Sequence, residues 1–453
     1  MRITQHLKSF LLGVSAAALL LLALPKPAEA ANVKACVDSL WPAARSAGVT
    51  RATFDRAFQG FTPDPEVIEA ANYQPEYVKP VGEYIDRAVS DKRIETGKQK
   101  LIEYQSLLGS LESRYGVDRT ILVAIWGVES NYGVQPGDKN VIRSLGTLIC
   151  SGTKASFARP QLISALKILQ RGDITLEAMN GSWAGAMGHT QFIPTTYSSY
   201  AVDQDGDGKR DIWNNIPDAL ASTASYLKVS NWHRGEAWGY EVTLPKGFDP
   251  KRVNENALKP IAAWQKAGLV RVTGEPFPRP GDQASLFAPE GTRGPAFLVL
   301  NNFRSILRYN QAKSYALAVG HLSDRLKGYG PFVHPWPTDE THLSLDQRME
   351  LQRLLIVQGL MAGEPDGVVG PATLEAVKTY QRAKGMGVDG FPSLTILKLL
   401  RNEPPPVNVG AAQPAGEQQP AAAGAHVSAP PPTNTTATPA PAAPAPPANA
   451  GQE

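Results

Sequence analysis

The chain has 453 residues, of which 42% are hydrophobic and 19% are charged, and its formal net charge is +3. This length is sufficient for two or three domains, and the apolar content is sufficient for a buried core. The small net charge, together with the lack of a long basic run in the sequence, excludes a strongly basic nucleic-acid-binding protein.

The first 30 residues have the composition of a secretory signal. Arg2 and Lys8 form a short basic region, residues 10–24 are apolar, and an Ala-Glu-Ala sequence at 28–30 matches a cleavage site. A single membrane anchor is the alternative, but the apolar run is short for a span and is followed by prolines. We therefore predict cleavage after Ala30 and a periplasmic protein without a membrane span.

Two cysteines, Cys36 and Cys150, are present in the whole chain. In an oxidising compartment, two cysteines in a mature chain predict one disulfide, which would tie an N-terminal helix to the core of the domain. Two separate buried thiols are the alternative. The sequence has no cluster of Cys and His typical of a metal site.

Helical patterns dominate the first 230 residues. Residues 33–130 predict helices joined by short loops, and 139–181 and 217–229 continue this pattern around a glycine-rich loop at 182–200. Between 240 and 300 the sequence changes to Pro, Gly and short β-favouring runs, which predict a small sheet or irregular subdomain. An apolar run and two further helices, over 297–326, complete a domain that we place at 31–330.

A proline-rich linker over 331–342 leads to a second unit at 343–401. The unit contains an internal repeat, in which the turns Asp366-Gly367 and Asp389-Gly390 are each followed by a helix. This pattern predicts a small helical bundle built from a half-repeat. Residues 402–453 are rich in Pro and Ala and nearly devoid of aromatics, and we expect them to be disordered.

The stretch from Thr120 to Gly133 carries the first chemical signal. An almost unbroken apolar helix delivers one carboxylate, Glu129, just before it ends. Burial raises a carboxyl pKa, and a Glu that stays protonated near neutral pH can act as a general acid. The alternatives are an exposed Glu at a helix end or a structural pair with Arg143.

Several residues elsewhere suit carbohydrate binding. Gly185 and Gly188 allow the backbone of a loop to approach a ligand, and Ser182 and Gln191 offer hydrogen bonds beside it. Aromatic rings that could stack on sugar faces, with core packing as the alternative, are Trp126, Trp183, Tyr197, Tyr226 and Tyr309.

A glycosidase usually needs two carboxylates. Asp138 and Glu177 lie in polar stretches and could as easily be solvated. A lone Glu suits chemistry in which the substrate supplies its own nucleophile.

Three motifs in this order resemble the lytic murein transglycosylases of the B type: ESNYG at 129–133, GAMGHTQFIPTTY at 185–197 and F-x-x-I-L-R-Y-N at 303–310. The resemblance covers about residues 33–330, and 343–401 resemble the three-helix peptidoglycan-binding module. It implies a mainly α fold: a lysozyme-like catalytic domain with a small irregular or β subdomain, followed by that module.

The resemblance also implies an activity. Glu129 matches the single acid/base of the family, which cleaves the β-1,4 bond between N-acetylmuramic acid and N-acetylglucosamine and leaves a 1,6-anhydro-muramyl end. Family positions that hold the sugar or orient its N-acetyl group are matched by Ser182, Gln191, Tyr226, Tyr309 and Asn310, with Tyr84 as a further contact. The expected partners are peptidoglycan glycan strands.

Residues 203–211 follow the D-x-D-x-D-G pattern of a calcium loop. The predicted oxygen ligands are Asp203, Asp205, Asp207, Lys209 at the backbone-carbonyl position, and Asp218 as a late carboxylate. Position 12 is Asn214 rather than Glu, so sodium, an empty loop or a simple Asp/Gly-rich turn are alternatives. We expect no required cofactor and a structural Ca²⁺ as the candidate ion.

Two other functions remain open at this point. A hydrolytic muramidase of the same fold would use water and leave a reducing end, although the missing second carboxylate argues against it. A non-catalytic cell-wall binding protein would share the module but not need Glu129. The sequence decides neither the oligomeric state nor whether chain ends or interiors are cut.

Overall fold

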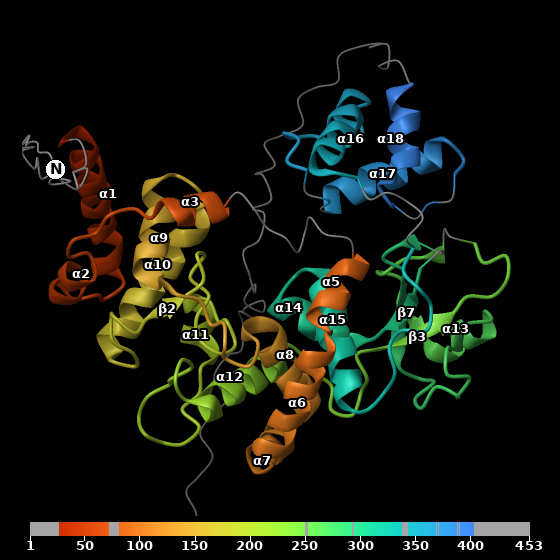
Figure 1. Ribbon diagram of the computed structural model, residues 1–453, viewed down its shortest axis with the longest axis horizontal. Coiled ribbons are helices and arrows are strands. Elements are labelled where there is room, and N and C mark those ends of the chain that lie inside the picture. Colours follow the sequence, from red (N-terminus) through yellow and green to blue (C-terminus); the bar gives the residue numbers. More distant parts are fainter. Residues whose placement is uncertain are drawn as a thin grey trace, which may run out of the picture.

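A computed structural model shows a largely helical chain (Figure 1). It describes residues 27–71, 81–249, 252–291, 294–337, 343–367, 369, 371–386, 388 and 390–402. Most of the predicted signal peptide, up to residue 26, and the predicted disordered tail from 403 onward lie outside these residues. Among the helices in the described ranges, none is both long and apolar enough to cross a membrane.

One helix, α8 (Arg119–Ser130), is buried at the centre of the larger domain. Every residue from Thr120 to Gly127 is buried, as its continuous apolar sequence predicts. Asp118 caps its N-terminus by accepting a hydrogen bond from the Thr120 backbone N–H, and Asn131, in the left-handed conformation, ends it. Around it pack α6 (Asp91–Glu103), α7 (Gln105–Tyr115), α12 (Ile216–Val229) and α15 (Lys313–Leu326).

A second helical group contains the N-terminal elements (Figure 1). Its helices are α1 (Pro27–Ser46), α2 (Arg51–Ala57), α3 (Pro65–Ala71), α9 (Val141–Cys150) and α10 (Ala155–Arg171). A disulfide joins Cys36 of α1 to Cys150 at the last residue of α9. The N-terminal helix is therefore covalently tied to the core of the domain.

Helix α11 (Pro194–Tyr200) contacts both groups, because it packs against α10 and against α12. Helix α5 (Val81–Ala88) packs against α15. A two-stranded sheet, β1 (Lys139–Asn140) with β2 (Asn180–Gly181), brings the start of α9 beside the glycine-rich loop. This pairing places the 182–192 loop next to the turn that follows α8.

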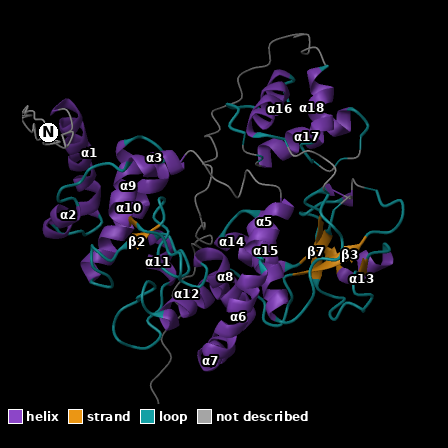
Figure 2. Cartoon of the chain, in the orientation of Figure 1, coloured by secondary structure: helices purple, strands orange, loops and turns teal. Residues whose placement is uncertain are grey.

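The sequence between 239 and 299 forms a five-stranded antiparallel sheet in the order β4-β6-β7-β3-β5 (Figure 2). Its strands are β3 (Gly239–Thr243), β4 (Lys259–Pro260), β5 (Val270–Arg271), β6 (Gln283–Phe287) and β7 (Ala296–Val299). A separate apolar core forms where Trp264 of α13 (Ile261–Lys266) packs with Val242, Leu286 and Leu298. The predicted β subdomain is confirmed, and β7 leads directly into α14 (Asn301–Tyr309).

The first half of the predicted linker is packed against the larger domain. The buried carboxylate of Glu241, on β3, accepts hydrogen bonds of 2.8 Å from the backbone N–H groups of Val333 and His334. Phe332 stacks on the His321 ring at 3.7 Å, and Trp336 lies against α5, where a Cβ on Gly82 would meet its ring at 2.7 Å. Residues 331–337 thus belong structurally to the larger domain.

The C-terminal unit contains α16 (Leu345–Val357), α17 (Pro371–Ala383) and α18 (Leu394–Arg401), which share one apolar core. Two equivalent contacts support the half-repeat. The Gly367 backbone N–H donates to Gln352 Oε1 of α16 at 2.6 Å, and the Gly390 N–H donates to Gln381 Oε1 of α17 at 2.8 Å. The predicted three-helix module is confirmed.

Candidate active site

Glu129 is the penultimate residue of α8 and is half-buried. Its carboxylate Oε1 accepts a hydrogen bond of 2.6 Å from the hydroxyl of Tyr315, on α15. The alternative of a structural pair with Arg143 is not supported, because the Arg143 guanidinium donates to the Thr62 carbonyl and lies 3.6 Å from Asp64. Glu129 is thus a carboxylate at the end of an apolar helix, held by a tyrosine hydroxyl.

Tyr315, which donates its hydroxyl to Glu129, is a residue of the candidate site that sequence reasoning missed. It is 1% exposed, and burial followed by the Glu129 carboxylate raises its pKa well above the ordinary value. The hydroxyl therefore stays protonated and remains a donor to Glu129. In the sequence Tyr315 is one aromatic residue within an apolar helix, and nothing there distinguishes it from an ordinary core side chain.

Tyr309 connects Glu129 to the glycine-rich loop. Its ring lies parallel to that of Tyr315 with centroids 6.5 Å apart, and its hydroxyl donates to the Thr190 carbonyl in the loop. Burial, followed by the Glu129 carboxylate, raises its pKa well above the usual value. The loop, Tyr309, Tyr315 and Glu129 are therefore linked by a continuous series of contacts.

The loop needs glycine for its shape. Gly188 has a φ of +67°, and a Cβ there would meet the Ile212 carbonyl oxygen at 2.3 Å. Ser182 is half-buried, and its Oγ accepts a 3.0 Å hydrogen bond from the Ala186 backbone N–H. Gln191 is 8% exposed with a φ of +52°, and its amide nitrogen donates to the carbonyls of Pro136 and Gly188. Both predicted ligands thus also shape the loop.

Two of the other predicted contacts, Tyr226 and Asn310, are more buried than their proposed role requires. Tyr226, 1% exposed, donates its hydroxyl to the Arg308 carbonyl, and its ring packs on Tyr309 at 5.1 Å. Asn310 is 5% exposed, and its Oδ1 accepts from the Ala312 backbone N–H. Tyr84 is half-buried on α5.

Four of the five candidate stacking rings are core residues: Tyr226 and Tyr309, described above, and Trp126 and Tyr197. Trp126 is 1% exposed and packs edge-on against Tyr104 and Tyr132, and Tyr197 is fully buried with its hydroxyl 2.9 Å from Asp173. Sugar stacking by these two rings is excluded because their faces are covered. Trp183 is half-buried, with the Lys154 ammonium 5.6 Å from its ring centroid.

The candidate second carboxylates, Asp138 and Glu177, are both exposed. Their position favours the solvated alternative.

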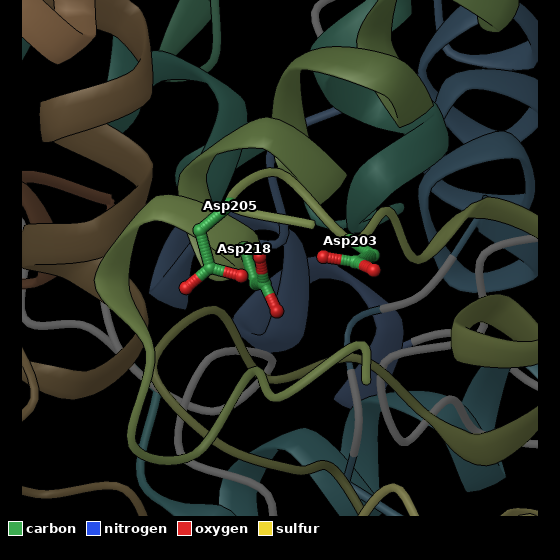
Figure 3. Close-up of side chains that lie close together, drawn as sticks. All are labelled: Asp203, Asp205 and Asp218. Atoms are coloured by element: carbon green, nitrogen blue, oxygen red, sulfur yellow. The ribbon is translucent and has the colours of Figure 1, made fainter. Parts of the chain in front are cut away.

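The acidic loop gathers three carboxylates in a second location. Oxygen atoms of Asp203, Asp205 and Asp218 all lie within 4.8 Å of one another (Figure 3). Burial, opposed by hydrogen bonds from the Gln204 and Asp211 backbone N–H groups, raises the pKa of Asp218, and the two neighbouring carboxylates raise it further. A bound cation would relieve this repulsion.

The oxygen donor set fits a hard cation such as Ca²⁺. Asp203, Asp205 and Asp218 would hold it, whereas Asp207 is not part of the converging group. Asp207 is exposed, and its Oδ1 accepts the Lys209 backbone N–H at 2.8 Å, so its carboxylate is used within the turn. The ligand predicted from Lys209 is its backbone carbonyl, not its side chain.

Comparison with known proteins decides the family. The family described as "Transglycosylase SLT domain" matches residues 32–324, which are more than half of the chain. A peptidoglycan binding domain family matches residues 344–400. The chain belongs to the transglycosylase SLT domain family. The predicted resemblance to lytic transglycosylases of the B type with a C-terminal peptidoglycan-binding module is confirmed.

Relatives of this family resemble the chain to different extents. It is 31% identical over 247 residues to membrane-bound lytic murein transglycosylase B of Escherichia coli (strain K12), covering 53% of this chain and 65% of that protein. This match spans slightly less than two thirds of the relative's length.

Solved structures extend the comparison. SltB3 from Pseudomonas aeruginosa, in complex with NAG-anhNAM-pentapeptide, has 50% identity and a TM-score of 0.77, covering 82% of this chain and 99% of its own. Escherichia coli Slt35 in complex with calcium has 27% identity and a TM-score of 0.56, covering 65% of this chain and 92% of its own. These similarities confirm the lysozyme-like, mainly α fold.

Proposed function

We propose that the protein is a lytic transglycosylase that cleaves the β-1,4 bond between N-acetylmuramic acid and N-acetylglucosamine in peptidoglycan. The observation that carries this proposal is the half-buried Glu129, hydrogen-bonded to Tyr315 at 2.6 Å beside the glycine-rich loop. The substrate class is supported by SltB3, whose structures contain NAG-anhNAM-pentapeptide and NAG-NAM-pentapeptide.

In the proposed reaction, protonated Glu129 donates its proton to the glycosidic oxygen as the bond to C1 of the muramic acid breaks. The Tyr315 hydroxyl stabilises the carboxylate that forms, because a hydrogen bond to a charged acceptor is stronger than one to a neutral acceptor. The substrate N-acetyl group stabilises positive charge at C1. The Glu129 carboxylate then removes the proton of the C6 hydroxyl, whose oxygen closes onto C1 to form the 1,6-anhydro ring.

This sequence returns Glu129 to its protonated state and consumes no water. One carboxylate is therefore sufficient, consistent with the exposed positions of Asp138 and Glu177. Ser182, Gln191, Tyr226, Tyr309 and Asn310 would shape the sugar subsite, and Tyr84 would contact the substrate from α5. Because several of these side chains already bind backbone carbonyls, we assign them mainly to fixing the walls of the site.

The remaining parts of the chain fit this function. Asp203, Asp205 and Asp218 would bind a structural Ca²⁺, and this assignment is supported by the structure of Slt35 in complex with calcium. Helices α16–α18 would tether the enzyme to glycan strands. The N-terminal residues 1–30 would direct export to the periplasm, where peptidoglycan lies.

The test is digestion of purified peptidoglycan with the mature protein and with Glu129→Gln, followed by mass spectrometry of the muropeptides. We expect anhydro-muramyl products from the wild type and a loss of more than about 100-fold in the variant, the usual size of a general acid-base contribution. Glu177→Gln, which neutralises an exposed carboxylate, is the matched control and should stay active.

Other outcomes select the alternatives. Reducing-end products from the wild type would identify a hydrolytic muramidase. No products from either protein, with both still sedimenting with the cell wall, would identify a non-catalytic binding protein.

A further inference from the structure

His189 lies between the helix that delivers Glu129 and the glycine-rich loop. Its ring Nδ1 accepts a hydrogen bond of 3.0 Å from the indole Nε1–H of Trp126, and its backbone carbonyl accepts one of 2.6 Å from Ser130 Oγ. Trp126 and Ser130 are both on α8, on either side of Glu129. His189 therefore accepts hydrogen bonds from α8 at two positions, three residues before Glu129 and one residue after it.

The same residue is fixed from two further directions. Its backbone N–H donates to the Ile212 carbonyl at 2.9 Å. Its ring packs on the turn after α8, where a Cβ on Gly133 would meet the ring carbon Cε1 at 2.2 Å. Ser130 Oγ completes the unit by accepting the Gly133 backbone N–H at 2.9 Å. The ring thus fills a close-fitting space that holds the helix end and the loop together.

The hydrogen bond from Trp126 defines the proton state of the ring. An indole N–H can only donate, so His189 Nδ1 must carry no proton and the neutral ring has its proton on Nε2. An imidazolium has N–H at both positions and would turn the contact into a clash of two donors. The Trp126 contact therefore exists only while His189 is neutral.

The surroundings favour that neutral form. Burial lowers the pKa of His189 from the ordinary value of 6.5, and the Lys100 ammonium on α6 lowers it further, while Asp211 in the acidic loop opposes the shift. The Lys100 Nζ also lies 5.7 Å from the centroid of the Trp126 ring. At neutral pH the ring is uncharged and the contact is intact.

We propose that His189 is a positioning residue that, in its neutral form, holds the Glu129 end of α8 against the glycine-rich loop. It does not touch the reacting atoms, and its effect passes through Trp126 and Ser130. This role rests on the proposed transglycosylase function. It predicts that activity falls on the acid side as His189 gains a proton, at a pH below 6.5.

Two substitutions separate the hydrogen bond from simple packing. His189→Asn retains a neutral acceptor, its Oδ1, near the position of Nδ1, and it does not titrate. His189→Leu fills the space without an acceptor and leaves the buried indole N–H unpaired, which costs about 1–3 kcal/mol. When this free energy is lost from the catalytic step, kcat/KM at pH 7 falls about 5- to 150-fold. We expect the loss in kcat rather than in KM.

The experiment measures kcat/KM from pH 4.5 to 8 for the wild type and both variants, with thermal melts to establish that each variant is folded. We expect His189→Asn to keep most activity at pH 7 and to lose the acid-side decline that depends on His189. His233→Asn, an exposed histidine paired with Glu236, is the matched control and should retain the wild-type profile. A folded His189→Leu with wild-type kcat, or an unchanged acid limb in His189→Asn, would overturn the proposal.

A second readout does not depend on activity. In ¹⁵N NMR spectra, the indole N–H of Trp126, assigned with Trp126→Phe, should shift as pH falls below 6.5 in the wild type and not in His189→Asn. If the enzyme is inactive but this titration is seen, the proposed function fails and the contact stands. If the enzyme is active but the indole signal does not respond to pH, the positioning role is wrong.

Discussion

The hydroxyl of Tyr315 allows the proposed mechanism to be tested by removing one atom. Tyr315→Phe deletes the donor that lies 2.6 Å from Glu129 Oε1 and leaves the buried ring in place. A hydrogen bond to a charged group contributes about 1.5–3 kcal/mol. Because the donor favours the ionised carboxylate, its loss makes Glu129 hold its proton to a higher pH.

The expected effect has two parts. Since 1.36 kcal/mol corresponds to one pH unit, the pH above which kcat/KM declines should rise by about 1–2 units. Glu129 also becomes a weaker acid, and if about half of the carboxylate charge has developed in the transition state, about 0.75–1.5 kcal/mol is lost there. The plateau of kcat should then fall about fourfold to twelvefold.

The assay follows the release of anhydro-muropeptides by mass spectrometry between pH 5 and 9. Tyr132→Phe is the matched control, because this buried tyrosine, three residues from Glu129 in the chain, donates its hydroxyl to the Arg93 carbonyl at 2.7 Å. It should lose stability without moving the basic limb. An unchanged or downward-shifted limb in Tyr315→Phe would refute the assigned role of the hydroxyl.

Two further predictions concern stability. The Cys36–Cys150 disulfide closes a loop with a sequence separation of 114. A double Cys→Ser variant should therefore lose about 4–5 kcal/mol in the free energy of unfolding, measured by chemical denaturation. A reducing agent should destabilise the wild type but not the variant. Calcium at about 100 times its dissociation constant should stabilise the wild type by about 2.7 kcal/mol, seen as a higher Tm than in EDTA. Asp205→Asn should weaken this response, and a wild-type Tm indifferent to calcium would contradict the assigned ion site.

Local sequence was sufficient for the elements whose burial is continuous or strictly patterned. The apolar run before Glu129 predicted α8 and its end, because a helix that is apolar on most faces has few alternatives to the core. The β-favouring runs near 240 and 270 became β3 and β5, and the repeated turns at Gly367 and Gly390 marked the three-helix module. Resemblance in three motifs identified the family.

Other features depended on contacts that no local pattern encodes. The predicted linker was read from its prolines, yet residues 331–337 are held by Glu241, about 90 positions earlier. Trp126 and Tyr197 were candidates for stacking on sugars because they are aromatic, and only the packing showed that their faces are covered. Periodicity indicates that a side chain is buried, but not which neighbour it meets.

The same limit applies to the site itself. The sequence by itself determined the carboxylate, the glycines of the loop and the aspartates of the acidic turn, because each depends on residue type and short spacing. Tertiary structure alone placed the Tyr315 hydroxyl on Glu129 across 186 positions, and His189 under Trp126 across 63. Hydrogen bonds of this kind follow from the crossing of α8 with α15 and from the close approach of the loop to α8. Helix packing fixes these distances, and it depends on the whole core rather than on any one segment.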